Sequence, residues 1–321
     1  MHAKIMLLPG TAAGEKLRPL AEAMLTEVSA AFDHSFVLMQ GKIGEKAVAV
    51  CGEALPENTL RACLQCQAVL LCDTACESAQ ALLDEMDMPL RIRSLCVPAS
   101  LCGRHEAPVS LYIAQAFSID SDTVRRAMRA AFRFAQGEDA RVMIVPANGP
   151  AGDEFLSAAR VQAVDFPQLS WSDCSAQAAV TGMIAAPERM GMTFCPPYAG
   201  GILTAAGTAL CSRPGLIYDA SMDDSAPGVY GPLVPPEDDG LSPFGLAGAI
   251  AAMLRYSLGL QREAACLEAA VNNVQSAGWQ SAGADAEASA AQTITRRVCE
   301  QIAVAGELLT KGGFSGGVAK A

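Results

Sequence analysis

The chain has 321 residues, of which 51% are hydrophobic and 5% aromatic, and its net charge is −11 at pH 7. This length fits two domains or one large α/β unit, and the composition excludes a disordered protein. The negative charge argues against nucleic acid or an anionic membrane as a partner. No apolar run reaches the ~18 residues of a membrane span, and the run at residues 5–8 is too short for a signal peptide. We therefore expect a cytoplasmic protein.

The first half of the chain alternates predicted strands with predicted helices. Apolar residues at helical spacing, such as Leu17, Leu20, Met24 and Val28, place the first helix at residues 15–32. A later helix at 121–137 has a candidate N-cap at Ser121 or Asp122 and ends at a glycine. The other expected elements are strands at 4–8, 35–39, 68–72 and 110–114, a turn at 10–14 and a helix at 58–67.

The second half continues the pattern, which is typical of a mostly parallel sheet. We expect strands at 141–145 and 190–195, and helices at 154–164, 200–210, 243–258 and 263–274. Residues 211–241, rich in Pro, Asp and Gly, predict an irregular hinge or loop. The glycine-rich tail at 311–317 predicts a flexible end.

The twelve cysteines indicate free thiols, because nothing in the chain signals export. Apolar neighbours predict that Cys51, Cys195, Cys211 and Cys266 are small core residues. A second group could hold zinc or an iron–sulfur cluster, namely Cys63, Cys66, Cys72 and Cys76. The first two of these fall in a predicted helix and the third ends a predicted strand, so we expect no metal there, and the role of the group stays open.

Several segments, in the right order, resemble the isocitrate/isopropylmalate dehydrogenase family, and its isopropylmalate dehydrogenases most closely. The most specific is Ser242-Pro-Phe-Gly-Leu-Ala-Gly-Ala-Ile-Ala-Ala-Met-Leu-Arg-Tyr-Ser257. The others include Leu7-Leu-Pro-Gly10, Ala54-Leu-Pro-Glu-Asn-Thr-Leu60, the helix at 124–135, Ala147-Asn148 and Tyr198-Ala-Gly-Gly-Ile-Leu-Thr-Ala-Ala-Gly207.

The resemblance implies an α/β fold in which two α/β domains share a mixed, largely parallel sheet. The first, cofactor-type domain would comprise residues 1–92 and 213–321. The second, for substrate and dimerisation, would be residues 93–212. Family members are homodimers with the active site between domains and subunits. They oxidise a 2-hydroxy acid such as 3-isopropylmalate with NAD or NADP, and decarboxylate the product with Mg²⁺ or Mn²⁺.

The chain departs from the family where the chemistry is expected. The two metal-binding aspartates of one helix fall on Gly201 and Ala205, and the catalytic lysine falls on Pro146. A third aspartate, contributed across the dimer, survives as Asp173, for which a helix N-cap is the favoured interpretation. The tyrosine that completes protonation lies in a segment lost between Ala114 and Phe117. Tyr112, nearby, is expected in the core.

The family's substrate arginines align with Glu85, with Cys96 or Val97, and with Ala114. Arg91 and Arg93 are either displaced substitutes or surface charges flanking a strand, and the second interpretation is favoured.

The cofactor loops are altered too: the first turn is Gly10-Thr-Ala-Ala-Gly14, and the loop near the nicotinamide is Cys72-Asp-Thr-Ala-Cys76. In the adenine loop, Ser225-Ala226-Pro227 matches the family while Met222 or Asp223 replaces its histidine. A second alignment puts Val234 at the histidine. Clustered carboxylates would repel a pyrophosphate here: Asp223, Asp224, Glu237, Asp238 and Asp239.

These losses predict a catalytically inactive member that binds no metal or cofactor and acts as a regulatory or structural partner, or is a remnant. It would be a homodimer, or a heterodimer with a family member. One alternative is a repurposed small-molecule binder using Asp173, Asn148, Tyr198 and the cysteines near the turn. The other is an active dehydrogenase that requires NAD and Mg²⁺ or Mn²⁺. The histidines, His2, His34 and His105, form no nucleophile–base pattern.

Overall fold

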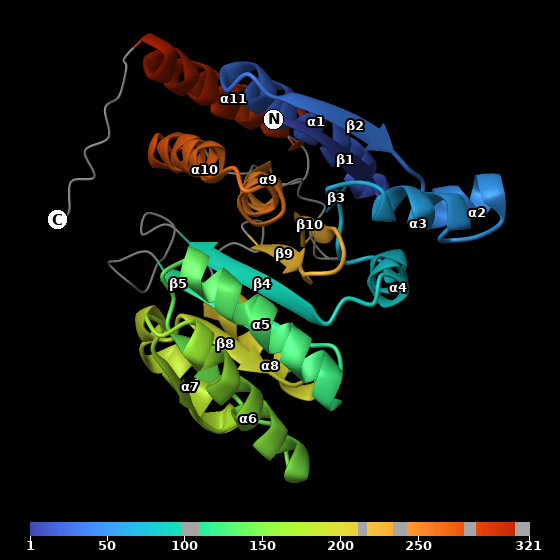
Figure 1. The fold of residues 1–321 in the computed structure, drawn as a ribbon. Helices are drawn as coiled ribbons and strands as arrows, with labels where there is room; N and C mark the ends of the chain where they lie inside the picture. Colours follow the sequence, from blue (N-terminus) through green and yellow to red (C-terminus); the bar gives the residue numbers. More distant parts are fainter. Residues whose placement is uncertain (98–108, 211–216, 234–242, 279–286, 312–321) are drawn as a thin grey trace.

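The computed structural model describes residues 1–97, 109–210, 217–233, 243–278 and 287–311. Its centre is a ten-stranded sheet in the order β2-β1-β3-β10-β9-β4-β5-β8-β6-β7 (Figure 1). The pairs β9–β10, β4–β9 and β4–β5 are antiparallel, and the other neighbours are parallel. The mixed, largely parallel sheet of an α/β fold is confirmed. The proposed division into two domains stays a prediction.

The strands are β1 (His2–Leu8), β2 (Ser35–Gln40), β3 (Ala68–Leu71), β4 (Leu90–Val97), β5 (Val109–Ala116), β6 (Val142–Ile144), β7 (Trp171–Asp173), β8 (Met192–Cys195), β9 (Ile217–Ser221) and β10 (Gly228–Pro232). The helices are α1 (Ala12–Ala31), α2 (Glu45–Cys51), α3 (Glu57–Leu64), α4 (Glu77–Glu85), α5 (Ser121–Gly137), α6 (Pro150–Asp165), α7 (Ala176–Ala185), α8 (Pro197–Leu210), α9 (Pro243–Tyr256), α10 (Gln261–Ser276) and α11 (Glu287–Lys311).

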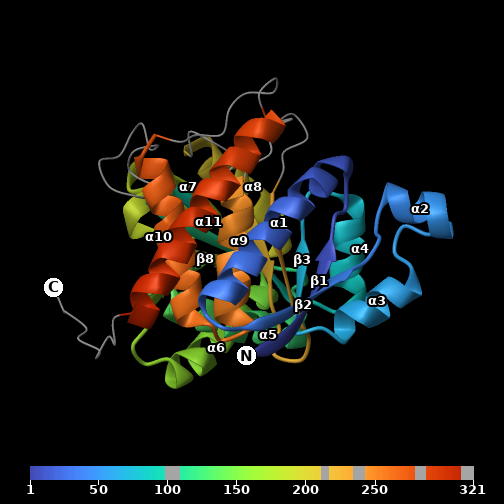
Figure 2. The same ribbon diagram turned by 90° about the horizontal axis from the view of Figure 1, so that it is seen from above.

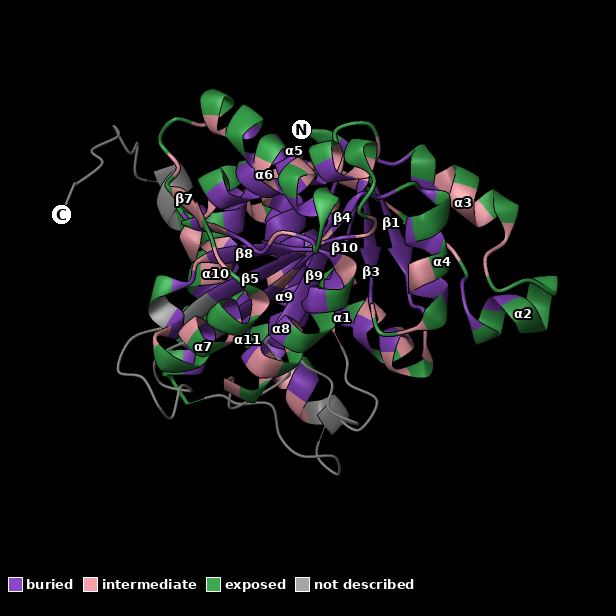
Figure 3. Cartoon of the chain, turned by 90° about the horizontal axis from the view of Figure 1, so that it is seen from below, coloured by how far each residue is buried: buried purple, intermediate pink, exposed green. Residues whose placement is uncertain are grey.

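The two faces of the sheet are covered differently. One face carries a single large core under α1, α5, α6, α9, α10 and α11 (Figure 2). The other face carries two separate smaller cores. The first packs α3 and α4 on β1 and β3, and the second packs α7 and α8 on β5 and β8. Figure 3 shows the buried strands at the centre of the molecule with helices around them. The sheet centre between the two smaller cores is therefore the part of this face that can carry polar side chains.

Two strands lie in the segment that the sequence predicts as irregular. β9 and β10 occupy 217–221 and 228–232, and both are at the centre of the sheet. β4, at 90–97, also has no counterpart in the sequence prediction. Turn-forming Pro, Asp and Gly around these strands mask their short apolar runs, while tertiary pairing on both edges stabilises them.

Smaller predictions are corrected as well. The N-cap of α5 is Asp120, whose carboxylate accepts a hydrogen bond from the Thr123 N–H at 2.9 Å. Cys195 is buried as predicted, but Cys51 is exposed and Cys266 only half-buried. Cys211 lies outside the described residues, as do residues 312–317 of the predicted tail.

Candidate functional site

The α8 helix presents bare positions where the resemblance places metal ligands. Gly201 and Ala205 are one turn apart and both are exposed. A Cβ built on Gly201 meets no atom within 4 Å, so the position has room for a side chain. A hard divalent cation needs oxygen ligands, and neither residue has one in its side chain. These residues therefore do not fit Mg²⁺ or Mn²⁺.

Beside α8, the end of β6 leads into a cavity of about 700 Å³. Pro146, where the resemblance places the family's lysine, lines it together with Asn148. Helices α7 and α8 supply the other walls, including Val180, Tyr198 and Ile202. The structure thus brings together two of the predicted binding residues, Asn148 and Tyr198. It offers no ionisable group at Pro146 to remove a proton.

The remaining predicted site residue, Asp173, is not a lining residue of this cavity. It ends the edge strand β7, where it is exposed and pairs in register with Ile144. The expectation that it caps the next helix is wrong. Ser175 is the N-cap of α7, and its hydroxyl accepts a hydrogen bond from the Ala178 N–H at 3.2 Å.

A buried ion pair occupies the sheet centre between the two smaller cores. Asp219 on β9 lies opposite Arg93 on β4, and Arg93 donates two hydrogen bonds to its carboxylate. The Thr74 hydroxyl is 3.2 Å from Asp219 Oδ2, and the Arg91 guanidinium is 4.0 Å from the same oxygen. Arg91 also donates to Gln80 at 2.7 Å and lies over the Phe117 ring. Arg91 and Arg93 are therefore neither surface charges nor free forks for a substrate carboxylate.

Electrostatic interactions favour the ionised form of Asp219 in this buried ion pair. Complete burial alone would raise the pKa of Asp219, but the charge and hydrogen bonds of Arg93, with smaller help from Arg91 and Thr74, lower it below its ordinary value. The pair is ionised at neutral pH, and each charge is compensated within the protein. Sequence reasoning missed Asp219, although a lone acid inside the apolar run at 217–220 signals a buried partner.

The first turn, where the resemblance implies a cofactor loop, holds a carboxylate. Thr11 caps α1 and donates to Asp73 at 2.6 Å, and Asp73 also accepts from the Ala75 N–H at 2.9 Å. Asp73 is 4% exposed. Helix N-termini attract anions. Here the protein supplies its own anion, so the turn does not fit a nucleotide phosphate.

Of the two alignments of the adenine loop, only the one through residues 225–227 falls on described residues. Residues 225–227 lie in the turn between the antiparallel strands β9 and β10, at the opposite edge of the sheet from the first turn. Asp223 and Asp224 there pair with Arg126 and Arg133 of α5. They therefore do not face the first turn. Val234 and the acids at 237–239 lie outside the described residues.

The cysteine group does not assemble a metal site. Within the described residues, no three His, Cys, Asp or Glu side chains are grouped to hold a metal ion. Cys63 and Cys66 lie in the apolar core under α3, and burial raises the pKa of Cys63 and of Cys72 to about 12. These thiols stay protonated at neutral pH, and they do not line the cavity beside α8.

The remaining positions that the resemblance aligns with substrate arginines carry no cationic side chain. Glu85 is exposed at the end of α4, and Ala114 is buried in β5. Cys96 and Val97 end β4. Tyr112 is buried as expected and donates to Glu138 at 2.8 Å, so its hydroxyl is engaged.

Comparison with known proteins identifies relatives along most of the chain. No protein-family model matches it. A 3-isopropylmalate dehydrogenase of Priestia megaterium is 24% identical over 333 residues, covering 88% of this chain and 90% of that protein. One of Rhodopirellula baltica is 26% identical over 325 residues, covering 85% and 90%. The crystal structure of an isocitrate dehydrogenase from Methylococcus capsulatus matches with a TM-score of 0.76 at 19% identity, over 93% of this chain and all of that one.

Proposed function

This chain belongs to the isocitrate/isopropylmalate dehydrogenase family, and we propose that it is a catalytically inactive member acting as a regulatory or structural partner of a family protein. The observation that carries the proposal is the bare α8 face. Gly201 and Ala205 offer no oxygen to a divalent cation where the resemblance requires two carboxylates.

Two further absences act on other steps of the reaction. A positioned general base contributes about 10²–10⁴-fold to such a step, and Pro146 supplies none. Substrate recognition needs free guanidinium forks, but Arg93 is bonded to Asp219 at 2.7 and 2.8 Å. Loss of any one of these groups is severe, and their effects overlap rather than multiply.

A pairing role is supported by the surface of α7 and α8. Ile184, Tyr198 and Ile202 are large hydrophobic residues that are 54%, 50% and 61% exposed. Tyr198 and Ile202 also line the cavity beside Pro146. Adjacent exposed apolar side chains, such as Tyr198 and Ile202, mark interaction sites on proteins. The partner is a second copy of this chain or another family member.

The test measures pairing and turnover separately. We expect light scattering after gel filtration to give a dimer, either for the chain alone or when it is co-expressed with a 3-isopropylmalate dehydrogenase. Ile202→Glu should give monomers, whereas Val164→Glu, at a still more exposed site on α6, should not. A monomer under every condition, without effect on the dehydrogenase, would refute the partner role.

Two alternatives remain as weaker candidates. The mixed lining of the 700 Å³ cavity, with Asn148 and Thr181 beside apolar residues, favours a repurposed small-molecule binder. A ligand at 100 times its Kd would stabilise the fold by about 2.7 kcal/mol, which a thermal-shift screen detects. The other candidate is an active dehydrogenase. An active dehydrogenase would reduce NAD in the presence of Mn²⁺ with 3-isopropylmalate, isocitrate, malate or tartrate as the substrate. We expect no NAD reduction with any of the four.

The last part of the proposal concerns the cellular compartment. Within the described residues, no helix is long and apolar enough to cross a membrane. We propose, separately from that finding, that the protein is cytoplasmic, and a cell fractionation tests this.

A further inference from the structure

The two edges of the sheet differ in how well they are protected from further strand pairing. β7, at one edge, has three residues and ends at the exposed Asp173. β2, at the other edge, has six residues and pairs with β1 in unbroken register (Figure 1). Residues 35–40 include no charged residue and no proline, the usual protections of an edge strand. β2 is therefore open to pairing with a further strand.

Half of the backbone polar groups of β2 point away from the sheet. The Gly41 N–H, just after the strand, donates to the Leu7 carbonyl of β1 at 3.2 Å. Successive residues of a strand bond to opposite sides, so the odd-numbered residues of β2 bond to β1. The outward-facing N–H and C=O groups belong to Phe36, Leu38 and Gln40. Among the described residues, no strand pairs with this edge.

The open edge continues an apolar face. Met39 lies opposite Met6 in register, so its side chain is on the same face as the smaller core under α3 and α4. These two helices pack on β1 and β3, and they leave Val37 and Met39 of β2 37% and 39% exposed. A strand added at this edge would therefore bring apolar side chains together as well as backbone groups.

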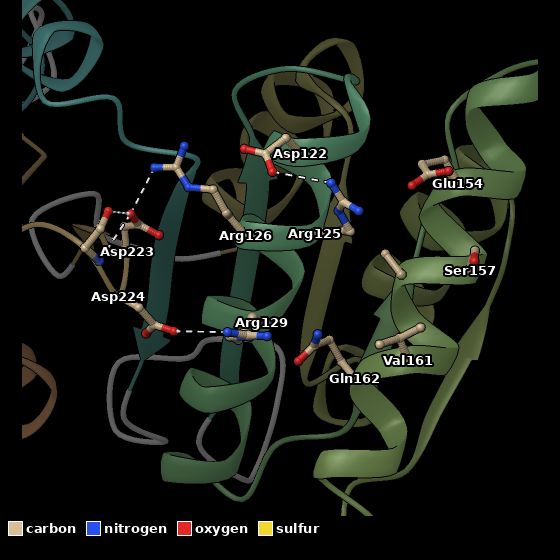
Figure 4. A pocket seen from close by; sticks show the side chains of 12 residues that line it. Asp122, Arg125, Arg126, Arg129, Glu154, Ser157, Val161, Gln162, Asp223 and Asp224 are labelled. Carbon is tan, nitrogen blue, oxygen red and sulfur yellow. Dashed lines mark hydrogen bonds and ion pairs between the residues drawn. The ribbon is translucent and has the colours of Figure 1, made fainter.

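Charged residues at the two ends of β2 are free to bind a partner. Figure 4 shows the opposite case, a cavity of about 560 Å³ between α5 and α6, where the charges compensate each other, as Arg126 does with Asp223 at 2.9 Å. Asp33, before β2, and Lys42, after it, are both exposed. Within the part of the chain that the structure describes, neither side chain is in an ion pair.

We propose that β2 pairs with β2 of a second copy of this chain, antiparallel about a two-fold axis at Leu38. Phe36 then lies opposite Gln40 of the second copy, and about six backbone hydrogen bonds use every outward-facing group. On the apolar face, Val37 lies opposite Met39 of the second copy, twice by symmetry. This contact goes beyond the proposed function, because β2 is at the other end of the sheet from α7 and α8.

The same register makes the ends of the two strands complementary in charge. In an antiparallel pair, the start of one strand meets the end of the other. Lys42 of one copy lies opposite His34 of the other, whose ring contacts Glu263 at 2.8 Å, and beside Asp33. The two-fold axis repeats this attraction at the second end, and electrostatic complementarity of this kind fixes the register.

The nearest like charges are too far apart to oppose the pairing. Lys4 is exposed and lies opposite Val37 in register on β1. Three strand spacings separate it from Lys4 of the second copy, about 14 Å. This exceeds the Debye length of about 8 Å at physiological salt, so their repulsion is largely screened.

The contact is weak because it is small. A strand of six residues is about 20 Å long, and two such strands bury less than the ~1,200 Å² of a standard interface. Such contacts dissociate when the protein is diluted during gel filtration. They form at the higher concentrations that sedimentation equilibrium can reach.

Sedimentation equilibrium of the Ile202→Glu chain tests the contact, since this background removes the pairing proposed for α8. We expect monomers at about 5 µM and dimers at about 500 µM. Val37→Lys/Met39→Lys in that background places like charges directly opposite each other and should raise the Kd at least about tenfold. The control Val161→Lys/Val164→Lys makes the same charge change at exposed sites on α6 and should leave the Kd unchanged.

A recovery of association provides the sharper test, because misfolding cannot produce it. In the same background, Lys42→Asp and Asp33→Lys should each associate about fivefold more weakly, because each makes the strand ends repel. An equal mixture of the two variants restores opposite charges at both ends, and we expect its association to return to within about twofold of the unmodified background.

Three results would each overturn the pairing of β2. They are a monomer at every concentration, equal association of the Val37→Lys/Met39→Lys chain and its control, and no recovery in the mixture. None of them bears on the partner role proposed above, because the α8 contact is absent from every sample.

Discussion

Arg93 and Asp219 face each other across β4 and β9, with Nε at 2.7 Å from Oδ1 and Nη2 at 2.8 Å from Oδ2. These two hydrogen bonds join β4 to β9 at the centre of the sheet, between the two smaller cores of one face. A fork that could hold a substrate carboxylate is instead satisfied by the protein.

The first prediction concerns the stability of this pair. Asp219→Ala leaves Arg93 and Arg91 as buried cations without their counter-charge, and we expect a loss of about 3–5 kcal/mol in the free energy of unfolding. Urea unfolding followed by circular dichroism measures it. Glu57→Ala breaks the exposed pair with Arg61 and should change the free energy by less than about 1 kcal/mol. Equal losses in both variants would contradict the burial argument.

The second prediction is the pH dependence of the same contact. The folded state lowers the pKa of Asp219, so its stabilisation is fully present above the unfolded pKa of about 3.9. The stabilisation is lost as the pH falls through the lower pKa of the folded state. We therefore expect the stability difference between wild type and Asp219→Asn to be constant near neutrality and to shrink below about pH 4. A difference that shrinks instead as pH rises would refute the sign.

A third prediction concerns Glu138, just after α5. Its carboxylate accepts hydrogen bonds from Tyr256 at 2.6 Å, Tyr112 at 2.8 Å and Arg255 at 3.1 Å. Because these partners come from β5 and α9, the residue ties separate elements of the large core. We expect Glu138→Ala to cost about 2–4 kcal/mol, measured by chemical unfolding.

The control for Glu138 is Glu300→Ala, at a surface pair with Arg297. This change should be close to neutral. A Glu138→Ala protein that unfolds at the wild-type urea concentration would show that the network is dispensable.

The fourth prediction is a stabilising change. Thr295 in α11 is 3% exposed, and its hydroxyl has no partner among the described residues. Thr295→Val keeps the shape and removes the unpaired group, so we expect a gain of about 1 kcal/mol. Thr181→Val is the matched control, since its hydroxyl donates to the Gln177 carbonyl at 2.9 Å, and it should give no gain. Differential scanning calorimetry distinguishes the two.

Periodic apolar spacing predicted the long elements of this fold well. The helix at 15–32 overlaps α1 and the helix at 121–137 coincides with α5, because each buries one continuous face. The strands β9 and β10 were missed, since their formation depends on neighbours far away in the sequence. The assignment of Gly201, Ala205 and Pro146 to the family's ligand and base positions stays a prediction from resemblance. The first two lie within the matched segment at 198–207, and Pro146 directly precedes the matched Ala147-Asn148.

The buried polar groups were beyond such reasoning. Arg93 is one residue in an unpredicted strand, and its partner is 126 residues away. Thr11 and Asp73 meet only because β1 and β3 are adjacent and parallel. No local pattern encodes such pairs, since register across a sheet decides which side chains face each other.

The last prediction restores oxygen ligands to α8. Gly201→Asp/Ala205→Asp places two carboxylates one turn apart on an exposed face, and the free space around Gly201 admits the new side chain. Replacing glycine gains a few tenths of a kcal/mol in helix propensity and replacing alanine loses about 0.7 kcal/mol, so the net cost is under about 0.5 kcal/mol and the fold should persist. We expect the variant to bind Mn²⁺ weakly, measured as a loss of the free-ion signal in electron paramagnetic resonance.

The control for that variant is Ala178→Asp/Ala185→Asp, which puts two carboxylates about two turns apart on α7 and should bind no better than wild type. The α8 double variant should still not reduce NAD with 3-isopropylmalate, because Pro146 supplies no base and Arg93 stays bonded to Asp219. Turnover by the wild-type chain, which lacks both aspartates, would contradict the assignment of these positions. Mn²⁺ binding without turnover in the variant separates loss of the metal site from loss of the other catalytic groups.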